Sequence, residues 1–190
     1  MNHIIVEDKL RDTNPVPVVI AFTPNYFIPA STCLYSIFAS LDIEEQMHVI
    51  CLLSEELTDR LKQKIQLIGG ERAQYSFINL QGRLQNIYID AKYTEAASYR
   101  LLLPDLLPEY DKVMYIDCDI IVRNNLVKLY RSVDLGNHYL AAVFEAPMDF
   151  QLGHLKAIGC HPDEYVNSGF LIMNLELMRR DNMVEKFIDA

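Results

Sequence analysis

Several features of other protein classes are missing from this sequence. It contains no tryptophan, and only 7 of its 190 residues are glycine and 8 are proline. These counts exclude collagen-like and low-complexity chains, in which glycine or proline dominates. Hydrophobic residues make up 51% of the chain, which is enough for one domain with a substantial buried core.

Basic residues are also scarce. The chain has 17 lysine and arginine residues against 26 acidic ones, a formal net charge of -9. This balance argues against non-specific binding of nucleic acid, which depends on clustered positive charge. It also means that a phosphorylated ligand would have to be neutralised locally, by a few placed arginines and lysines or by a metal ion.

Signals of membrane insertion, secretion and cross-linking are absent as well. The sequence has no run of 18 apolar residues, and Glu7, Asp8 and Lys9 interrupt its N-terminus, so we expect neither a transmembrane segment nor a signal peptide. The 4 cysteines lack the paired spacing of a zinc site or a disulfide framework. Scattered thiols fit a reducing compartment, so we expect a cytoplasmic protein. Peripheral membrane association in the full-length protein would have to come from other sequence.

Short apolar runs alternate with segments of helical periodicity. The expected strands cover residues 16–22, 47–53, 74–80, 112–116, 139–144 and 169–175. Of the expected helices, one is capped by Ser54 and stopped by Gly69-Gly70, and another is opened by Thr94 and broken or kinked at Pro104. The alternation predicts an α/β domain with a mostly parallel central sheet flanked by helices.

The most informative stretch is Asp117-Cys118-Asp119, which directly follows the apolar run at residues 112–116. In open α/β sheets ligands bind at the carboxyl ends of the strands, so both carboxylates are expected at a ligand site. Alternation along a strand places the two Asp side chains on one face and Cys118 on the other. Mg²⁺ and Mn²⁺ prefer oxygen ligands and commonly bind one or two carboxylates together with substrate phosphates. Without a cation, each carboxylate would repel a phosphate charge 4 Å away by about 4 kcal/mol.

The Asp-x-Asp pattern has other interpretations. Aspartate is common in turns, so the segment could be a solvated turn at a strand end. Haloacid-dehalogenase-like phosphatases also end an apolar strand in Asp-x-Asp and bind Mg²⁺, with the first Asp as nucleophile. In those enzymes the motif normally lies near the N-terminus on the first strand, whereas here it follows three expected strands. A Mg²⁺-dependent phosphatase is therefore the weaker alternative.

Three separate blocks of the sequence share their pattern with one enzyme family. The blocks are VVIAFTPNYFIPASTCLYSI, SYRLLLPDLLPEYDKVMYIDCDIIV and EYVNSGFLIMNL. Together they resemble the family-8 retaining glycosyltransferases of the bacterial lipopolysaccharide galactosyl- and glucosyltransferase type. The likeness spans about residues 16–180 and implies the GT-A fold, a Rossmann-like nucleotide-diphospho-sugar transferase fold.

The resemblance also implies roles for particular residues. Asp117 and Asp119 are the expected ligands of Mn²⁺ or Mg²⁺. The expected nucleotide-binding residues are Ala21, Thr23, Asn25, Tyr26, Arg100 and Cys118. The expected sugar-binding residues are Arg100, Glu145, Asn167, Ser168 and Gly169. Many family members carry Asp where Thr23 stands, and threonine can still hydrogen-bond a base edge.

The implied activity is transfer of a hexose from UDP-galactose or UDP-glucose, with retention, to a glycan or lipid-linked saccharide acceptor in surface polysaccharide or lipopolysaccharide synthesis. We assign residues 1–15 to an N-terminal lead-in and residues 16–190 to the nucleotide-sugar-binding domain. In the family a downstream His completes the metal site, and here no His follows His161. We therefore expect this domain to be incomplete at its C-terminus, with catalytic residues beyond residue 190. A non-catalytic UDP-sugar-binding fragment with little transfer activity stays open as an alternative.

Overall fold

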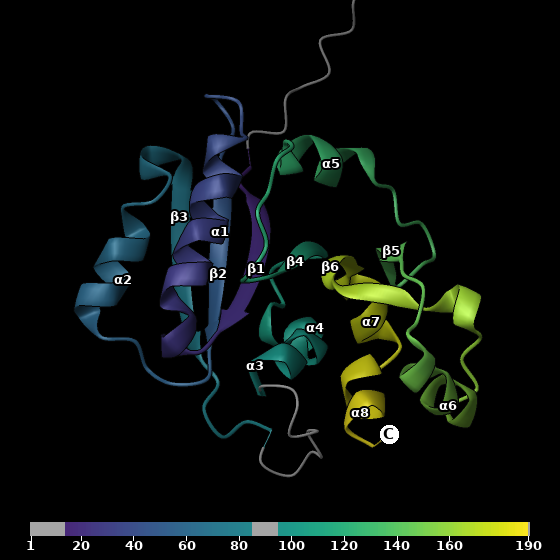
Figure 1. Ribbon diagram of the computed structural model, residues 1–190. Helices are drawn as coiled ribbons and strands as arrows, with labels where there is room; N and C mark the ends of the chain where they lie inside the picture. Colours follow the sequence, from purple (N-terminus) through teal and green to yellow (C-terminus); the bar gives the residue numbers. More distant parts are fainter. Residues whose placement is uncertain (1–13, 85–94, 190) are drawn as a thin grey trace, which may run out of the picture.

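The structure is a computed structural model that describes residues 14–84 and 95–189. Its centre is a six-stranded sheet in the order β3-β2-β1-β4-β6-β5 (Figure 1). The strands β1 (Val16–Phe22), β2 (Met47–Leu53), β3 (Ala73–Asn79) and β4 (Lys112–Asp117) run parallel. The strand β6 (Val166–Asn174) pairs antiparallel with both β4 and β5 (Leu140–Phe144). The expected α/β domain with a mostly parallel sheet is confirmed.

Helices cover both faces of this sheet, as Figure 1 shows. One face carries α1 (Phe27–Ala39), α2 (Asp59–Gln66) and α5 (Leu126–Ser132). The other carries α3 (Glu95–Ser98), η3 (Tyr99–Leu102), α4 (Leu103–Leu106), α7 (Leu175–Arg180) and α8 (Met183–Ile188). The remaining elements are η1 (Pro24–Tyr26), η2 (Gly70–Arg72), α6 (Asp149–Ala157) and η4 (Pro162–Glu164).

The two covered faces create two hydrophobic cores. Along β1, Ile20 and Phe22 face the core beneath α1, whereas Val19 and Ala21 face the core beneath α3 and α4. All seven residues of β1 are buried. Burial on both faces explains why this strand reads as an unbroken apolar run instead of an alternating one. The described residues contain no helix long and apolar enough to cross a membrane.

The predicted cap at Ser54 is wrong. The helix α2 begins at Asp59, after Thr58, and Ser54 lies directly behind the end of β2. The reason is tertiary packing: Leu57 is 2% exposed and belongs to the α1-side core, so the chain bends at Ser54 and Glu55 and buries Leu57 before the helix begins. The predicted stop at Gly69 is confirmed, since this residue adopts a left-handed conformation with φ of 83°.

Four further boundaries bear on the site. The predicted break at Pro104 is confirmed, because the segment divides into α3, η3 and α4 with Pro104 in the first turn of α4. Its predicted start at Thr94 lies outside the described residues. The strand β4 includes Asp117, one residue more than expected, and β6 begins at Val166, three residues earlier than expected.

Candidate functional site

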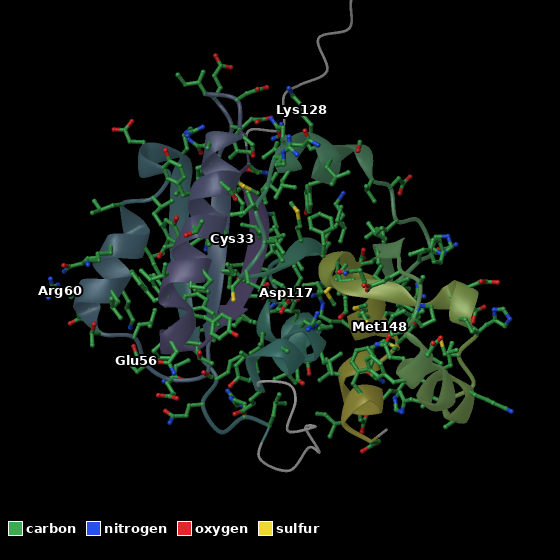
Figure 2. All side chains as sticks on the ribbon, in the orientation of Figure 1. Cys33, Glu56, Arg60, Asp117, Lys128 and Met148 are labelled. Atoms are coloured by element: carbon green, nitrogen blue, oxygen red, sulfur yellow. The ribbon has the colours of Figure 1, made fainter. Side chains whose placement is uncertain are left out.

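A cavity of about 290 Å³ lies at the carboxyl ends of β1 and β4. Its walls come from β1, η1, α3, β4 and the turn after β4. The lining residues are Ala21, Phe22, Thr23, Tyr26, Ala96, Ala97, Tyr115, Asp117, Cys118 and Asp119. Because β1 and β4 are adjacent and parallel, with Ala21 opposite Asp117, their ends open at the same edge of the sheet, where ligands bind in this class of fold. Figure 2 shows Asp117 near the middle of the molecule.

The segment Asp117-Cys118-Asp119 ends β4 and turns away from the sheet. Asp117 is half-buried and Asp119 is exposed, and both line the cavity. Cys118 is 9% exposed and belongs to the core on the α1 side. Burial, reinforced by the charges of Asp119 and Asp117, raises the pKa of the Cys118 thiol to about 12. The side chain of Cys118 is thus part of the core, and the oxygens of the two Asp are the available ligands on the cavity wall.

Two hydrogen bonds join the chain just after Asp119 to α1 and its C-terminal end. The backbone N–H of Val122 donates to Ser36 Oγ over 2.9 Å, and Ser40 Oγ donates to the carbonyl of Asn124 over 3.2 Å. These bonds join the chain just after Asp119 to a helix whose inner face is fully buried. The position of Asp119 therefore depends on a rigid element, although its side chain is exposed.

Arg100 of η3 connects three elements at this site. Its Nε donates to the carbonyl of Ala97 over 2.6 Å, and its Nη1 donates to the carbonyl of Ser168 in β6. The same Nη1 lies 3.8 Å from Asp117 Oδ1, and the guanidinium carbon lies 4.7 Å from the ring centroid of Tyr115. With only 13% of its side chain exposed, Arg100 is a fixed cation beside the carboxylate.

Sequence reasoning missed Tyr115, Ala96 and Ala97. The Tyr115 hydroxyl donates to Asp117 Oδ1 over 3.0 Å. Burial raises the pKa of Tyr115, so the hydroxyl keeps its proton and remains a donor. Tyr115 stands two residues before Asp117, and strand alternation alone would have placed both on one face. The two alanines precede Arg100 by three and four residues, and their small side chains leave the cavity open on the α3 side.

The strand β6 approaches the carboxylates closely. Asn167 Oδ1 accepts from the backbone N–H of Gly169 over 2.9 Å, and Asn167 Nδ2 donates to Glu145 Oε2 over 3.2 Å. A Cβ atom at Gly169 would lie 2.6 Å from Asp117 Oδ2. Only glycine therefore allows Asp117 to occupy its present position against β6.

The structure brings most of the expected site residues together. Four of them share the cavity with the two carboxylates: Ala21, Thr23, Tyr26 and Cys118. Arg100 links Asp117 to β6, and hydrogen bonds join Glu145, Asn167 and Gly169 beside it. Asn25 is exposed in η1 and is not among the lining residues.

The donor set fits a hard divalent cation that also takes ligands from its substrate. Among residues 14–84 and 95–189, no group of three or more His, Cys, Asp and Glu side chains gathers as a metal site. Asp117 and Asp119 supply carboxylate oxygens on the wall of an open cavity. Mg²⁺ and Mn²⁺ are commonly bound by one or two carboxylates plus phosphate oxygens, so the two Asp fit such a cation as its protein ligands within the described residues.

Comparisons with known proteins show which family the chain resembles. The family model described as Glycosyl transferase family 8 matches residues 17–190. General stress protein A of Bacillus subtilis is 24% identical over 183 residues, which are 95% of this chain and 63% of that protein. The chain thus spans less than two thirds of that relative.

Solved structures show the same fold. The galactosyltransferase LgtC, solved in complex with donor and acceptor sugar analogues, matches with a TM-score of 0.72 and 25% identity, over 92% of this chain and 66% of its own. The bifunctional glycosyltransferase WbbM matches with a TM-score of 0.79 and 23% identity, over 100% of this chain and 35% of its own. The GT-A fold expected from the resemblance is confirmed.

Proposed function

Because the chain belongs to glycosyl transferase family 8, we propose that it binds a UDP-hexose, either UDP-galactose or UDP-glucose, through a divalent cation held by Asp117 and Asp119. The observation that carries this proposal is that both carboxylates line one cavity together with Thr23 and Tyr26, at the ends of adjacent parallel strands. An acidic chain with this site needs a cation before it can accept a diphosphate.

Each end of the cavity has a distinct task. Ala21, Thr23 and Tyr26 form the wall for the nucleoside, and Asn25 is exposed in η1 between the last two. The carboxylates and the chain at Cys118 face the diphosphate and ribose. When bound, Mn²⁺ or Mg²⁺ neutralises the diphosphate and stabilises the charge that develops on it.

We propose that the hexose binds next to Asp117, on the side that faces β6. There Arg100, Asn167, Ser168 and Gly169 are joined by hydrogen bonds and by the close approach of Gly169 to Asp117. Glu145 is held to Asn167 and is available to accept hydrogen bonds from sugar hydroxyls. LgtC, with which the chain shares 25% identity, was solved with donor and acceptor sugar analogues, which supports a sugar-nucleotide donor for this chain.

The complete proposed reaction is Mn²⁺-dependent transfer of the hexose, with retention, to a glycan or lipid-linked saccharide acceptor in surface polysaccharide or lipopolysaccharide synthesis. Among the described residues of the site, we identify no nucleophile. A non-catalytic UDP-sugar-binding protein shares the same donor site, and an assay of hexose transfer separates the two. No observation favours the phosphatase, because β4 is the fourth strand in the chain and lies between β1 and β6.

Calorimetric titration of UDP, with and without Mn²⁺, tests the proposal. We expect Mn²⁺ to strengthen UDP binding to the unaltered protein, and Asp119→Ala to abolish this gain. Asp119 is exposed, so its removal should leave the fold intact. Asp163→Ala, at a carboxylate with 91% of its side chain exposed in η4, is the matched control and should behave like the unaltered protein. Equal UDP affinity with and without Mn²⁺ would refute the proposal.

A further inference from the structure

We propose that Tyr115 is a positioning residue for the donor site, which orients Asp117 through its hydroxyl and Arg100 through its ring. This inference rests on the proposed function, because it concerns how the metal-binding carboxylate and the neighbouring cation are prepared for the sugar nucleotide. One buried side chain then controls the two charged groups nearest to each other at the site.

The hydroxyl is the first half of this role. Tyr115 Oη donates to Asp117 Oδ1 over 3.0 Å, and Tyr115 is only 1% exposed. A hydrogen bond from a buried donor to a carboxylate is stronger than a bond between two neutral groups. The backbone of Tyr115 is also held on both sides, since it pairs with Val19 of β1 and with Leu171 of β6. The donor is therefore a fixed point that selects one orientation of the Asp117 carboxylate.

The aromatic ring of Tyr115 carries the second part of the positioning role, because it contacts Arg100. The guanidinium carbon of Arg100 lies 4.7 Å from the Tyr115 ring centroid, within range of a cation–π interaction. Donation to the carbonyls of Ala97 and Ser168 fixes the same guanidinium in the plane of its hydrogen bonds. Arg100 Nη1 is thereby held 3.8 Å from Asp117 Oδ1, the oxygen that also accepts from Tyr115. One hydrogen bond, from Tyr115, and one ion pair, with Arg100, meet on the same oxygen and restrict the rotation of the carboxylate.

Packing alone does not explain the hydroxyl. Phenylalanine would fill nearly the same volume, and the other fully buried residues of β4 are apolar: Val113, Met114 and Ile116. A buried hydroxyl is costly unless it has a hydrogen-bond partner, and the partner here is the carboxylate at the cavity. Tyr99 offers a contrast, because its buried hydroxyl donates to the backbone carbonyl of Leu80 over 3.2 Å. The Tyr115 hydroxyl thus donates to a carboxylate of the site, whereas the Tyr99 hydroxyl donates to a backbone carbonyl.

The experiment compares Tyr115→Phe with Tyr99→Phe, two variants that each lose one buried tyrosine hydroxyl. The measurements are UDP binding by calorimetry, with and without Mn²⁺, and Mn²⁺ binding by electron paramagnetic resonance at saturating UDP. Loss of a partner that orients a metal ligand typically lowers metal affinity about 10- to 100-fold. We expect a loss of this size in Tyr115→Phe, with metal-free UDP binding unchanged, and no loss in Tyr99→Phe.

The contact with the ring is tested separately by Arg100→Lys, which keeps the charge but loses the planar group that lies 4.7 Å from the Tyr115 ring centroid. We expect this variant to bind UDP-hexose at least about threefold more weakly than the unaltered protein, with a smaller effect on UDP. Thermal unfolding establishes that every variant is folded. If Tyr115→Phe does not fold, Arg100→Lys can still refute the role of the ring, because unchanged UDP-hexose binding would show that the planar group beside the ring is not needed.

The outcomes separate the two proposals. If the unaltered protein shows no Mn²⁺-dependent UDP binding, the proposed function is wrong. If it does, and Tyr115→Phe binds Mn²⁺ and UDP as tightly as Tyr99→Phe, the positioning role of the hydroxyl is wrong. Unchanged UDP-hexose binding by Arg100→Lys would overturn the role of the ring.

Discussion

Replacing Gly169 by alanine is a direct test of how the site is assembled. The added Cβ would lie 2.6 Å from Asp117 Oδ2 and 3.2 Å from both Asp117 Cγ and Asn167 Oδ1. Ordinary contacts begin at 3.4 Å, so the Asp117 oxygen must retreat by about 0.8 Å. The carboxylate is not free to do so, because Tyr115 donates to its Oδ1 and Arg100 lies beside it. Either the carboxylate or the backbone of β6 has to move.

Both movements have measurable consequences. Overpacking of this kind costs about 1–3 kcal/mol of folding free energy, which urea denaturation would detect. Misplacing a ligand-binding group by about 1 Å can cost roughly 100-fold in function. We therefore expect Gly169→Ala to weaken Mn²⁺-dependent UDP binding about 10-fold or more in calorimetry, and to weaken metal-free binding far less.

Gly153→Ala is the matched control. Gly153 lies within α6, and a Cβ there would have no heavy atom within 4 Å. Alanine is favoured over glycine in a helix by about 1 kcal/mol, so this variant should be as stable as the unaltered protein or more stable, with UDP binding unchanged. The reasoning is refuted if Gly169→Ala matches Gly153→Ala in both stability and Mn²⁺-dependent binding.

Three further predictions concern the rest of the molecule. Ser54→Ala should raise the free energy of unfolding in urea by about 1 kcal/mol, because the buried Ser54 hydroxyl has no hydrogen-bond partner within the described structure; a clear loss of stability would contradict this. Burial lowers the pKa of His48 below its ordinary 6.5, so the folded state favours the neutral imidazole. The stability that the neutral His48 contributes is present above pH 6.5 and is lost as the pH falls toward the folded pKa. Between about pH 7 and 5, the melting temperature of His48→Asn should therefore fall less than that of the unaltered protein. A parallel decline in both proteins would argue against a neutral His48. A thiol reagent should label Cys160 rapidly in the native protein and the three buried cysteines only after unfolding; rapid reaction of a second thiol would contradict the burial of Cys118.

The sheet could be predicted where burial is uniform. The bounds of β1 and β2 match the apolar runs at residues 16–22 and 47–53, because both strands are covered on their two faces. Prediction failed where tertiary packing decides. Ser54 followed by two glutamates has the composition of a helix start, but the buried Leu57 delays the helix. The start of β6 was missed because Asn167 and Ser168 are polar and exposed at the site, and apolar patterning does not detect such residues.

The site residues could also be predicted only in part from the sequence. Asp117 and Asp119 could be placed at a ligand-binding edge from the strand that precedes them. The contact between Arg100 and Ser168 spans 68 positions of the sequence, and local patterns carry no information about such a pairing. Tyr115 lies two residues before Asp117 in the sequence, but an aromatic residue inside an apolar run usually packs in the hydrophobic core. Only its hydrogen bond reveals that the hydroxyl serves the site.

The central claim is that Asp117 and Asp119 hold a divalent cation that binds a sugar nucleotide. Crystals of the protein grown with UDP and Mn²⁺ test it most directly, through the anomalous scattering of manganese. The account predicts one strong anomalous peak whose direct ligands are carboxylate oxygens of Asp117 and Asp119 and oxygens of the diphosphate. Bound UDP without a peak at these carboxylates, or a peak elsewhere with the two carboxylates uncoordinated, would contradict it.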